Sequence, residues 1–255
     1  MNTHIIVNEP CKNIRALARQ TLRGHWIQAV LLMLLTTGIT SLPSLIAGRL
    51  TDSIAVAILL DIFTVIVNGC LDLGLAVYFL KIFRQQEAGI NDLATGFDHM
   101  GNAVLLYVIM SLRIMLWSLL FIIPGIITAI KYSQAFYILA DDPGKSPYQC
   151  LYESAVMMEG NKDKYFRLNL SFIGWYLLAN MPQMAISAYV MPDFTFYSAE
   201  ELYNMAASIA NDPLVVISGL VTVLVSVYVS ASHACFYDLV NGNLYVQGGS
   251  EVYQQ

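Results

Sequence analysis

Long apolar stretches alternate with shorter polar connections along the whole chain. Six stretches are long enough to be candidate membrane helices, and they cover residues 26–48, 54–80, 103–123, 126–140, 166–190 and 213–237. A bilayer core of about 30 Å is crossed by roughly 20 apolar residues in a helix. The pattern therefore predicts an all-α polytopic transmembrane bundle of six spans. The stretch 126–140 is the shortest, and a re-entrant segment is the alternative to a full crossing there.

The distribution of Lys and Arg predicts the orientation of these spans. Ten basic residues flank one side of the predicted bundle, namely Lys12, Arg15, Arg19, Arg23, Lys81, Arg84, Lys145, Lys162, Lys164 and Arg167. The other side carries only Arg49, and the connection 191–212 has no basic residue. Because basic residues concentrate in cytoplasmic loops, we expect both termini in the cytoplasm. This divides the chain into a cytoplasmic amphipathic helix (1–25), a six-helix membrane domain (26–240) and a cytoplasmic tail (241–255).

Composition supports a membrane protein and argues against several other classes. Hydrophobic residues make up 57% of the 255 residues and charged residues 12%, against about 25% charged in a soluble domain. The net charge of −5 argues against a nucleic acid partner, which would need a basic face. The sequence contains no phosphate-binding glycine loop and no nucleophile or metalloprotease motif. We therefore predict no enzymatic activity, no cofactor and no metal site.

The N-terminal segment has the pattern of an amphipathic helix. Its basic residues share one helical face, and they are Lys12, Arg15, Arg19 and Arg23. Ile14, Leu17 and Ala18 fall on the opposite face. We expect this helix to lie on the inner leaflet with its cations toward anionic headgroups. A plain topology anchor is the alternative to a specific lipid or partner site.

The second predicted span has a polar face. The polar residues stand at offsets of 0, 3, 7 and 11, which places them within about 80° of arc on a helix; they are Asp61, Thr64, Asn68 and Asp72. Arg113 and Lys131 add two cations in the next two spans. Ionisable groups inside a span are costly and normally face a bundle interior or a wet cavity. The set predicts an ion, proton or polar-solute path, or else an internal ion-pair cluster that fixes packing. We expect Arg113 to pair with Asp72, and Lys131 to match Asp61 in depth.

Two further motifs predict local structure in the spans. Pro124 and Gly125 separate the third and fourth spans and predict a tight helical hairpin or a hard kink. In the fifth span, Ser171 and Gly174 are three residues apart on one face. Because small residues let membrane helices approach closely, we expect both to pack on a neighbouring helix, with Trp175 on an adjacent face.

Four stretches carry a family resemblance. LLFIIPGIITAIKYSQAFYILADDP (119–143) and SAVMMEGNKDKYFRLNLSFIGW (154–175) resemble two signatures of the bacterial membrane-protein family known as domain of unknown function 975. LDLGLAVYFLKIFRQQE (71–87) and FYDL (236–239) resemble weaker positions of the same family. The resemblance implies a multi-span protein of the bacterial cytoplasmic membrane with no known catalytic role. Its plan is similar to the membrane domain attached to some glycerophosphodiester phosphodiesterases.

These observations leave two main functions open, with an enzyme that acts on lipid as a third alternative. The first is a transporter or export accessory that uses the polar face of the second span. The alternative is a non-transporting membrane scaffold whose loop 141–165 docks a protein partner or a second copy of the chain. A water-accessible cavity around Asp61, Asn68 and Asp72 would favour the first, and a dry, paired core would favour the second.

Overall fold

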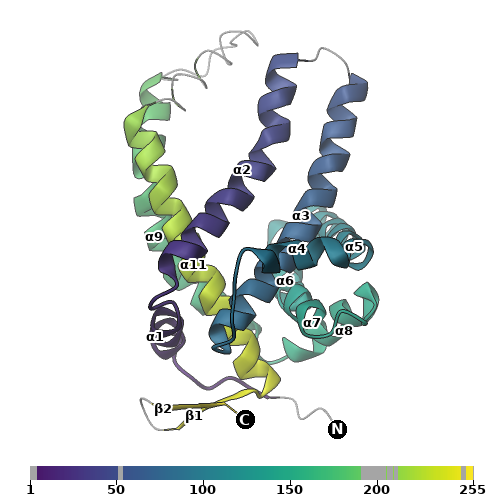
Figure 1. Ribbon diagram of the computed structural model, residues 1–255, viewed down its shortest axis with the longest axis vertical. Coiled ribbons are helices and arrows are strands. Elements are labelled where there is room, and N and C mark those ends of the chain that lie inside the picture. The colour runs from purple at the N-terminus through teal and green to yellow at the C-terminus, as the bar shows by residue number, and fades with distance from the viewer. Residues whose placement is uncertain are drawn as a thin grey trace.

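The computed structural model describes residues 5–50, 54–190, 205, 209, 212–247 and 251–254. Within these residues the chain is almost entirely helical, as predicted (Figure 1). The principal helices are α1 (Cys11–Thr21), α2 (Trp26–Leu50), α3 (Ile54–Phe83), α4 (Asn91–Asp98), α5 (Met100–Leu120), α6 (Ile122–Tyr132), α7 (Ala135–Asp141), α8 (Pro147–Met157), α9 (Lys162–Val190) and α11 (Pro213–Asn241). The predicted cytoplasmic tail adds a short antiparallel hairpin of β1 (Leu244–Gln247) and β2 (Glu251–Gln254).

Five segments in the described part of the chain are long and apolar enough to cross a membrane. They are Trp26–Pro43, Ile58–Phe83, Met100–Leu120, Ile122–Asp141 and Pro213–Asn241. Each coincides with one of the six predicted spans. The fifth predicted span is α9, which has 29 residues but is more polar because of residues such as Asn169, Asn180 and Gln183. The structure therefore supports a multi-pass membrane protein and provides five candidate spans.

The long helices share one packed end. α9 runs beside α11, and α2 packs on both α3 and α11. Figure 1 shows α1 and the β-hairpin at one end of the molecule, which we call the basal end. Toward the opposite end, where α2 is followed by α3, α2 and α3 diverge from α9 and α11. The packed core gathers aromatic side chains that are almost completely buried, among them Tyr78, Phe79, Phe172 and Phe236.

The candidate spans leave most of their own surface uncovered. Only 11% of Met100–Leu120 and 22% of Trp26–Pro43 is buried within the molecule. Leu119 is 84% exposed at the far end of α5. Exposed apolar surface of this extent is unstable in water but suits contact with lipid or with another membrane protein.

The predicted hairpin between the third and fourth spans is confirmed, although the break lies earlier than Pro124. Phe121 has extended backbone angles (φ −157°, ψ 147°) between the end of α5 and the start of α6. Pro124 falls in the first turn of α6, where a missing N–H costs little. Gly125 packs directly on α5, since a Cβ there would lie 2.9 Å from the Cα of Ser118. The glycine therefore serves the close approach of the two helices.

The apolar face of α1 is covered by protein. Ile14 and Ala18 are completely buried, and α1 packs against α11 and α9. The Tyr228 hydroxyl of α11 donates a 3.0 Å hydrogen bond to the Arg15 carbonyl. The amphipathic helix is thus confirmed, but its apolar face packs against α11 and α9 and not against the lipid leaflet.

Small residues do mediate close helix packing, but at positions other than the predicted ones. A Cβ on Gly74 of α3 would lie 2.8 Å from the Cα of Leu93, and one on Gly96 of α4 would overlap the Cys70 carbonyl. A Cβ on Gly174, by contrast, would meet no described atom within 4 Å. The prediction that Gly174 packs on a neighbouring helix is wrong for the described part of the chain.

The other two residues of that motif also lie away from a tight helix contact. The Ser171 hydroxyl donates to the carbonyl of Leu168 in its own helix (2.6 Å), and Trp175 is 56% exposed. Phe172, between them, is the residue that turns inward, with 1% of its surface exposed and its ring against Tyr228. The buried face of α9 is therefore rotated away from the small residues.

Candidate functional site

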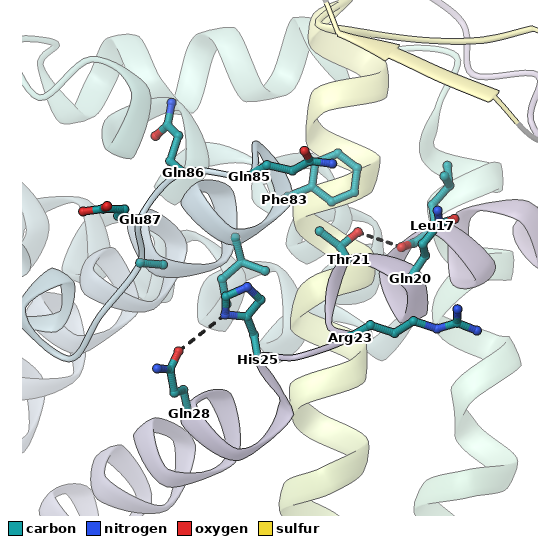
Figure 2. Close-up of a pocket in the computed structure, with 12 residues that line it drawn as sticks. Leu17, Gln20, Thr21, Arg23, His25, Gln28, Phe83, Gln85, Gln86 and Glu87 are labelled. Carbon is teal, nitrogen blue, oxygen red and sulfur yellow. Dashed lines mark hydrogen bonds between the residues drawn. The ribbon is translucent and has the colours of Figure 1, made fainter.

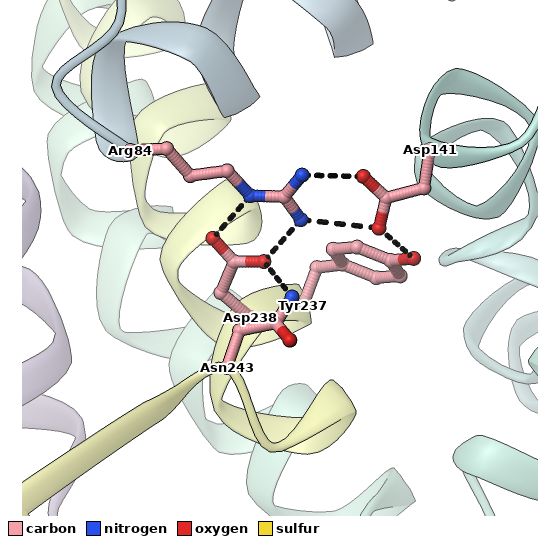
Figure 3. Close-up of polar contacts among 5 residues, drawn as sticks. All are labelled: Arg84, Asp141, Tyr237, Asp238 and Asn243. Atoms are coloured by element: carbon pink, nitrogen blue, oxygen red, sulfur yellow. Dashed lines mark hydrogen bonds and ion pairs between the residues drawn. The ribbon is translucent and has the colours of Figure 1, made fainter. Parts of the chain in front are cut away.

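The ends of three helices meet at one half-buried arginine. Arg84 follows directly after α3, Asp141 is the last residue of α7, and Asp238 lies in the last turn of α11. Figure 3 shows the Arg84 side chain between the two carboxylates. These residues, together with Tyr237 and Asn243, are called the Arg84 cluster below.

The guanidinium of Arg84 uses all three of its nitrogens. Its Nε and Nη2 donate to Asp238 at 3.1 and 2.6 Å. Its Nη1 and Nη2 donate to Asp141 at 2.5 and 3.0 Å. Two bidentate pairs on one arginine fix both the position and the plane of the group, which a lysine could not do.

Two neutral side chains complete the cluster. The Tyr237 hydroxyl donates to Asp141 Oδ2 at 2.7 Å, and the Asn243 amide donates to Asp238 Oδ1 at 3.1 Å. Asn243 reaches back because Gly242 ends α11 in the left-handed region, with φ of +80°, a helix end that glycine adopts without strain. Each carboxylate therefore accepts a hydrogen bond in addition to those from the arginine.

Burial makes this cluster electrostatically strong. The Asp238 side chain is 1% exposed, whereas those of Arg84 and Asp141 are 25% and 22% exposed. Burial alone would lower the pKa of Arg84, but hydrogen bonds and charge from Asp141 and Asp238 raise it above its usual value. With one cation between two carboxylates, the cluster forms an ion-pair network with a formal charge of −1.

The polar face of the second span, α3, does not form the predicted ion pairs. Asp61 is exposed and lines a groove of about 380 Å³ whose other lining residues are all apolar, from α3 and α5. The Thr64 hydroxyl donates to the Leu60 carbonyl of its own helix (2.8 Å). Asn68 and Asp72 are half-buried. Among the described residues, neither Asp61 nor Asp72 has an ion-pair partner.

The two cations of the next spans meet a tyrosine instead. Arg113 Nη1 donates to the Tyr132 hydroxyl at 3.0 Å, and its guanidinium lies 5.5 Å from the ring centre. Lys131 Nζ lies 5.4 Å from the same ring. The predicted Arg113–Asp72 and Lys131–Asp61 pairs are therefore wrong. The ring offers both cations a cation–π contact, and α6 rather than α3 supplies the partner.

The inner part of the α3 polar face approaches the Arg84 cluster through two tyrosines. Helix α3, which carries Asp72, packs against α7, which carries Tyr137. The Tyr137 ring stacks on that of Tyr237, with centroids 5.5 Å apart. Because Tyr237 also donates to Asp141, the two stacked rings extend the Arg84 cluster toward the side of α7.

One known family matches the chain in two overlapping stretches, residues 8–131 and 119–243. The chain belongs to the DUF975 family. DUF975 is described as a family of proteins of unknown function, so membership supports the fold assignment and the resemblance noted in the sequence. No curated protein and no solved structure matches the chain.

The Arg84 cluster brings together separate stretches of this DUF975 chain. Arg84 lies in the stretch 71–87, Asp141 in 119–143, and both Tyr237 and Asp238 in 236–239. Sequence reasoning used Arg84 only as one of the basic residues that predict topology, and it singled out neither Asp141 nor Asp238 as a functional residue. The common feature of these positions is a charged residue at the end of an apolar helix inside a recognisable family stretch.

Proposed function

We propose that this DUF975 protein moves a polar solute or ion across the membrane, or assists its export, and that the Arg84 cluster holds its basal end closed. The observation that carries the proposal is the asymmetry between the two ends. At the basal end, α3, α7 and α11 are joined by a buried ion-pair network. At the opposite end α2 and α3 diverge from α9 and α11 (Figure 1). A bundle that is fastened at one end and whose helices diverge at the other is suited to a hinge motion of the kind used in alternating access.

The proposal includes six crossings with both termini in the cytoplasm. α9 packs along α11, and each has 29 residues, enough to cross a bilayer. α1 and the β-hairpin share the basal end, which agrees with an even number of crossings. Under the positive-inside rule this end faces the cytoplasm. The family resemblance suggests the bacterial plasma membrane.

The polar face of α3 supplies the route in this proposal. Along α3, Asp61 lies nearer the end where the helices diverge, Asn68 follows, and Asp72 lies nearer the Arg84 cluster (Figure 1). Movement of α3 relative to α7 or α11 would break charge-assisted hydrogen bonds of Arg84, so opening of the basal end has a defined energetic cost. Opening would then connect Asp72 to the cytoplasm.

Cysteine accessibility tests this route. The four native cysteines are replaced by alanine, and Asn68→Cys is treated with a membrane-impermeant thiol reagent from either side of sealed vesicles. We expect Asn68→Cys to react only when the reagent is added on the side opposite the Arg84 cluster. When Arg84→Ala is also present, we expect it to react from the cluster side as well. Leu178→Cys, at a position 62% exposed on α9, is the lipid-facing control and should stay unreactive. If Asn68→Cys is unreactive in both backgrounds, the transport proposal fails.

One observation favours the scaffold as a second candidate. Helix α8 starts with a Ser146–Gln149 capping box and presents a stripe at a spacing of four residues. Tyr148, Tyr152 and Val156 are 60%, 72% and 39% exposed on it. A fixed helix with an exposed aromatic stripe suits partner docking. In this case the double change Tyr148→Ala and Tyr152→Ala would abolish recovery of a partner in cross-linking experiments. Asn68→Cys would then stay unreactive toward the impermeant thiol reagent from both sides of the vesicles.

A further inference from the structure

A pocket of about 700 Å³ lies between α1, the turn into α2 and the segment that follows α3. Figure 2 shows its lining, which is mainly polar. The side chains that matter for its chemistry are Arg23, His25, Gln28, Gln85, Gln86 and Glu87. We call this the interfacial pocket. It is separate from the Arg84 cluster, although Arg84 itself stands between two of its lining residues in the sequence.

The pocket combines opposite charges with amide groups. Arg23 and Glu87 are both exposed, and Figure 2 shows them on opposite sides of His25. The ring of His25 forms a 3.4 Å hydrogen bond with the Gln28 side chain. Gln85 and Gln86 add further donors and acceptors. Such a lining suits a small dipolar ligand that carries an anion at one end and a cation at the other.

The position of the pocket relative to the spans points to a lipid headgroup. One candidate span begins at Trp26, directly after His25, and another ends at Phe83, directly before Arg84. The pocket therefore lies where two membrane helices enter the polar layer of the bilayer. Leu17, Ile82 and Phe83 give it an apolar part, which can contact the glycerol and upper acyl region of a lipid.

Backbone strain marks the same site. Gln85 has φ of +54° and is the only non-glycine residue in the left-handed region among the residues that the structure describes. Its N–H bonds to the Ile82 carbonyl, and the Gln86 N–H bonds to the Lys81 carbonyl, so this conformation ends α3. Glycine or asparagine usually takes such a position. A non-glycine residue in a strained conformation beside a pocket points to a role for its side chain in that pocket.

We propose that the interfacial pocket binds the zwitterionic headgroup of a phosphoethanolamine lipid. Arg23 and His25 hold the phosphate through their side chains. Glu87 accepts hydrogen bonds from the primary ammonium, and the glutamine amides bind the remaining oxygens. This differs from a general attraction of α1 to anionic lipids, because Glu87 would disfavour a headgroup that carries only negative charge.

Thermal unfolding of the purified full chain in detergent measures this specificity. Short-chain phosphatidylethanolamine, phosphatidylcholine and phosphatidylglycerol are added separately, and soluble phosphoethanolamine forms a fourth arm. We expect a saturable rise in melting temperature with phosphatidylethanolamine and at least about tenfold weaker binding of the other two lipids, which corresponds to the loss of one charge-assisted hydrogen bond. Equal shifts from all three lipids would overturn the proposal. An equal shift from soluble phosphoethanolamine would overturn the lipid assignment and leave a site for the free phosphate ester.

Charge-matched variants separate binding from folding. Arg23→Gln and Glu87→Gln remove exposed charges and should each weaken phosphatidylethanolamine binding about tenfold or more, without lowering the melting temperature of the lipid-free protein. Lys12→Gln and Glu159→Gln remove the same charges at exposed positions outside the pocket and should bind as the parent does. If the two pairs of variants behave alike, binding is a bulk charge effect and the pocket is not the site.

Gln85→Gly gives an independent reading. Glycine relieves the strained φ, so the lipid-free variant should melt at a higher temperature than the parent. The same change removes an amide from the pocket and should weaken phosphatidylethanolamine binding. A variant that is both more stable and still fully binding would show that the Gln85 side chain has no part in recognition.

Discussion

Removal of Arg84 gives the most direct measure of how strongly the basal end is fastened. In Arg84→Ala, the Asp238 carboxylate, 1% exposed, loses both hydrogen bonds from the guanidinium and faces Asp141 with no cation between them. Breaking a buried pair by removing one partner costs about 3–5 kcal/mol. The Asp141 half contributes less, since its side chain is 22% exposed and water screens it. We therefore expect a loss of about 3–4 kcal/mol in the free energy of unfolding, most of it from Asp238.

The pairwise part of this loss is measured with a double-mutant cycle. Arg84→Ala, Asp238→Asn and the double variant are unfolded reversibly with increasing SDS in mixed micelles, and tryptophan fluorescence reports the transition. Asp238→Asn removes the charge but keeps an amide that Asn243 can still bind. The double variant should be more stable than the sum of the single effects predicts, by about 1–3 kcal/mol.

An exposed ion pair provides the control for this experiment. Arg167 and Asp163 form an i,i+4 pair in α9 whose side chains are 69% and 71% exposed. Arg167→Ala should cost no more than about 0.5 kcal/mol. If Arg84→Ala costs as little as Arg167→Ala, or if the cycle is additive, the cluster does not fasten the helices and the closed-end proposal loses its basis.

The remaining predictions concern packing and thiol reactivity. Gly125→Ala should destabilise the α5–α6 hairpin by about 1–3 kcal/mol, because its Cβ would overlap Ser118, whereas Gly174→Ala should be tolerated within about 0.5 kcal/mol; equal effects in SDS unfolding would contradict this packing. Cys150 is completely buried, and burial raises the pKa of its thiol to about 11, so about one molecule in a thousand is ionised at pH 8. Iodoacetamide should therefore label Cys150 far more slowly than Tyr152→Cys. Comparable labelling rates, measured by mass spectrometry, would refute the burial of Cys150.

The helices were predictable because each depends on a local pattern. Apolar runs of the required length, basic flanks and the spacing of residues such as Ile14 and Ala18 appear directly in the sequence. The α5–α6 hairpin was predictable for the same reason, since Pro124 and Gly125 interrupt a continuous apolar run. The exact break at Phe121 depends on how Gly125 meets Ser118, which is a tertiary contact.

Pairings between helices were harder to predict, and Arg113 shows why. Its depth in the membrane follows from its position in the span, but depth alone left both carboxylates of α3 as candidates. The actual partner, Tyr132, lies on the next helix, at the other side of the turn at Phe121. Consecutive antiparallel helices joined by a short turn are usually neighbours, so hairpin geometry favoured α6 over α3. The attraction of opposite charges was a weaker guide than connectivity.

Helix rotation explains the remaining errors. Ser171 and Gly174 share a face of α9, but a pattern within one helix does not say which face meets a neighbour, and Phe172 turns inward instead. The Arg84 cluster was missed because Arg84 and Asp238 are 154 residues apart in the chain. Only the fold brings those helix ends together. The one indication of the cluster in the sequence was that its charged residues stand at the ends of apolar helices, inside stretches that resemble the family.

The chain segment 83–86 connects the two sites of the molecule. Phe83, Gln85 and Gln86 line the interfacial pocket, while Arg84 between them binds Asp141 and Asp238. The left-handed turn at Gln85 directly follows Arg84, so a ligand that fixes the turn also restrains the backbone of Arg84. Binding and closure are then linked, and each must stabilise the other by the same free energy. In the lipid titrations this requires Arg84→Ala to lower the affinity for phosphatidylethanolamine although Arg84 does not line the pocket, and an unchanged affinity would show that the two sites act independently.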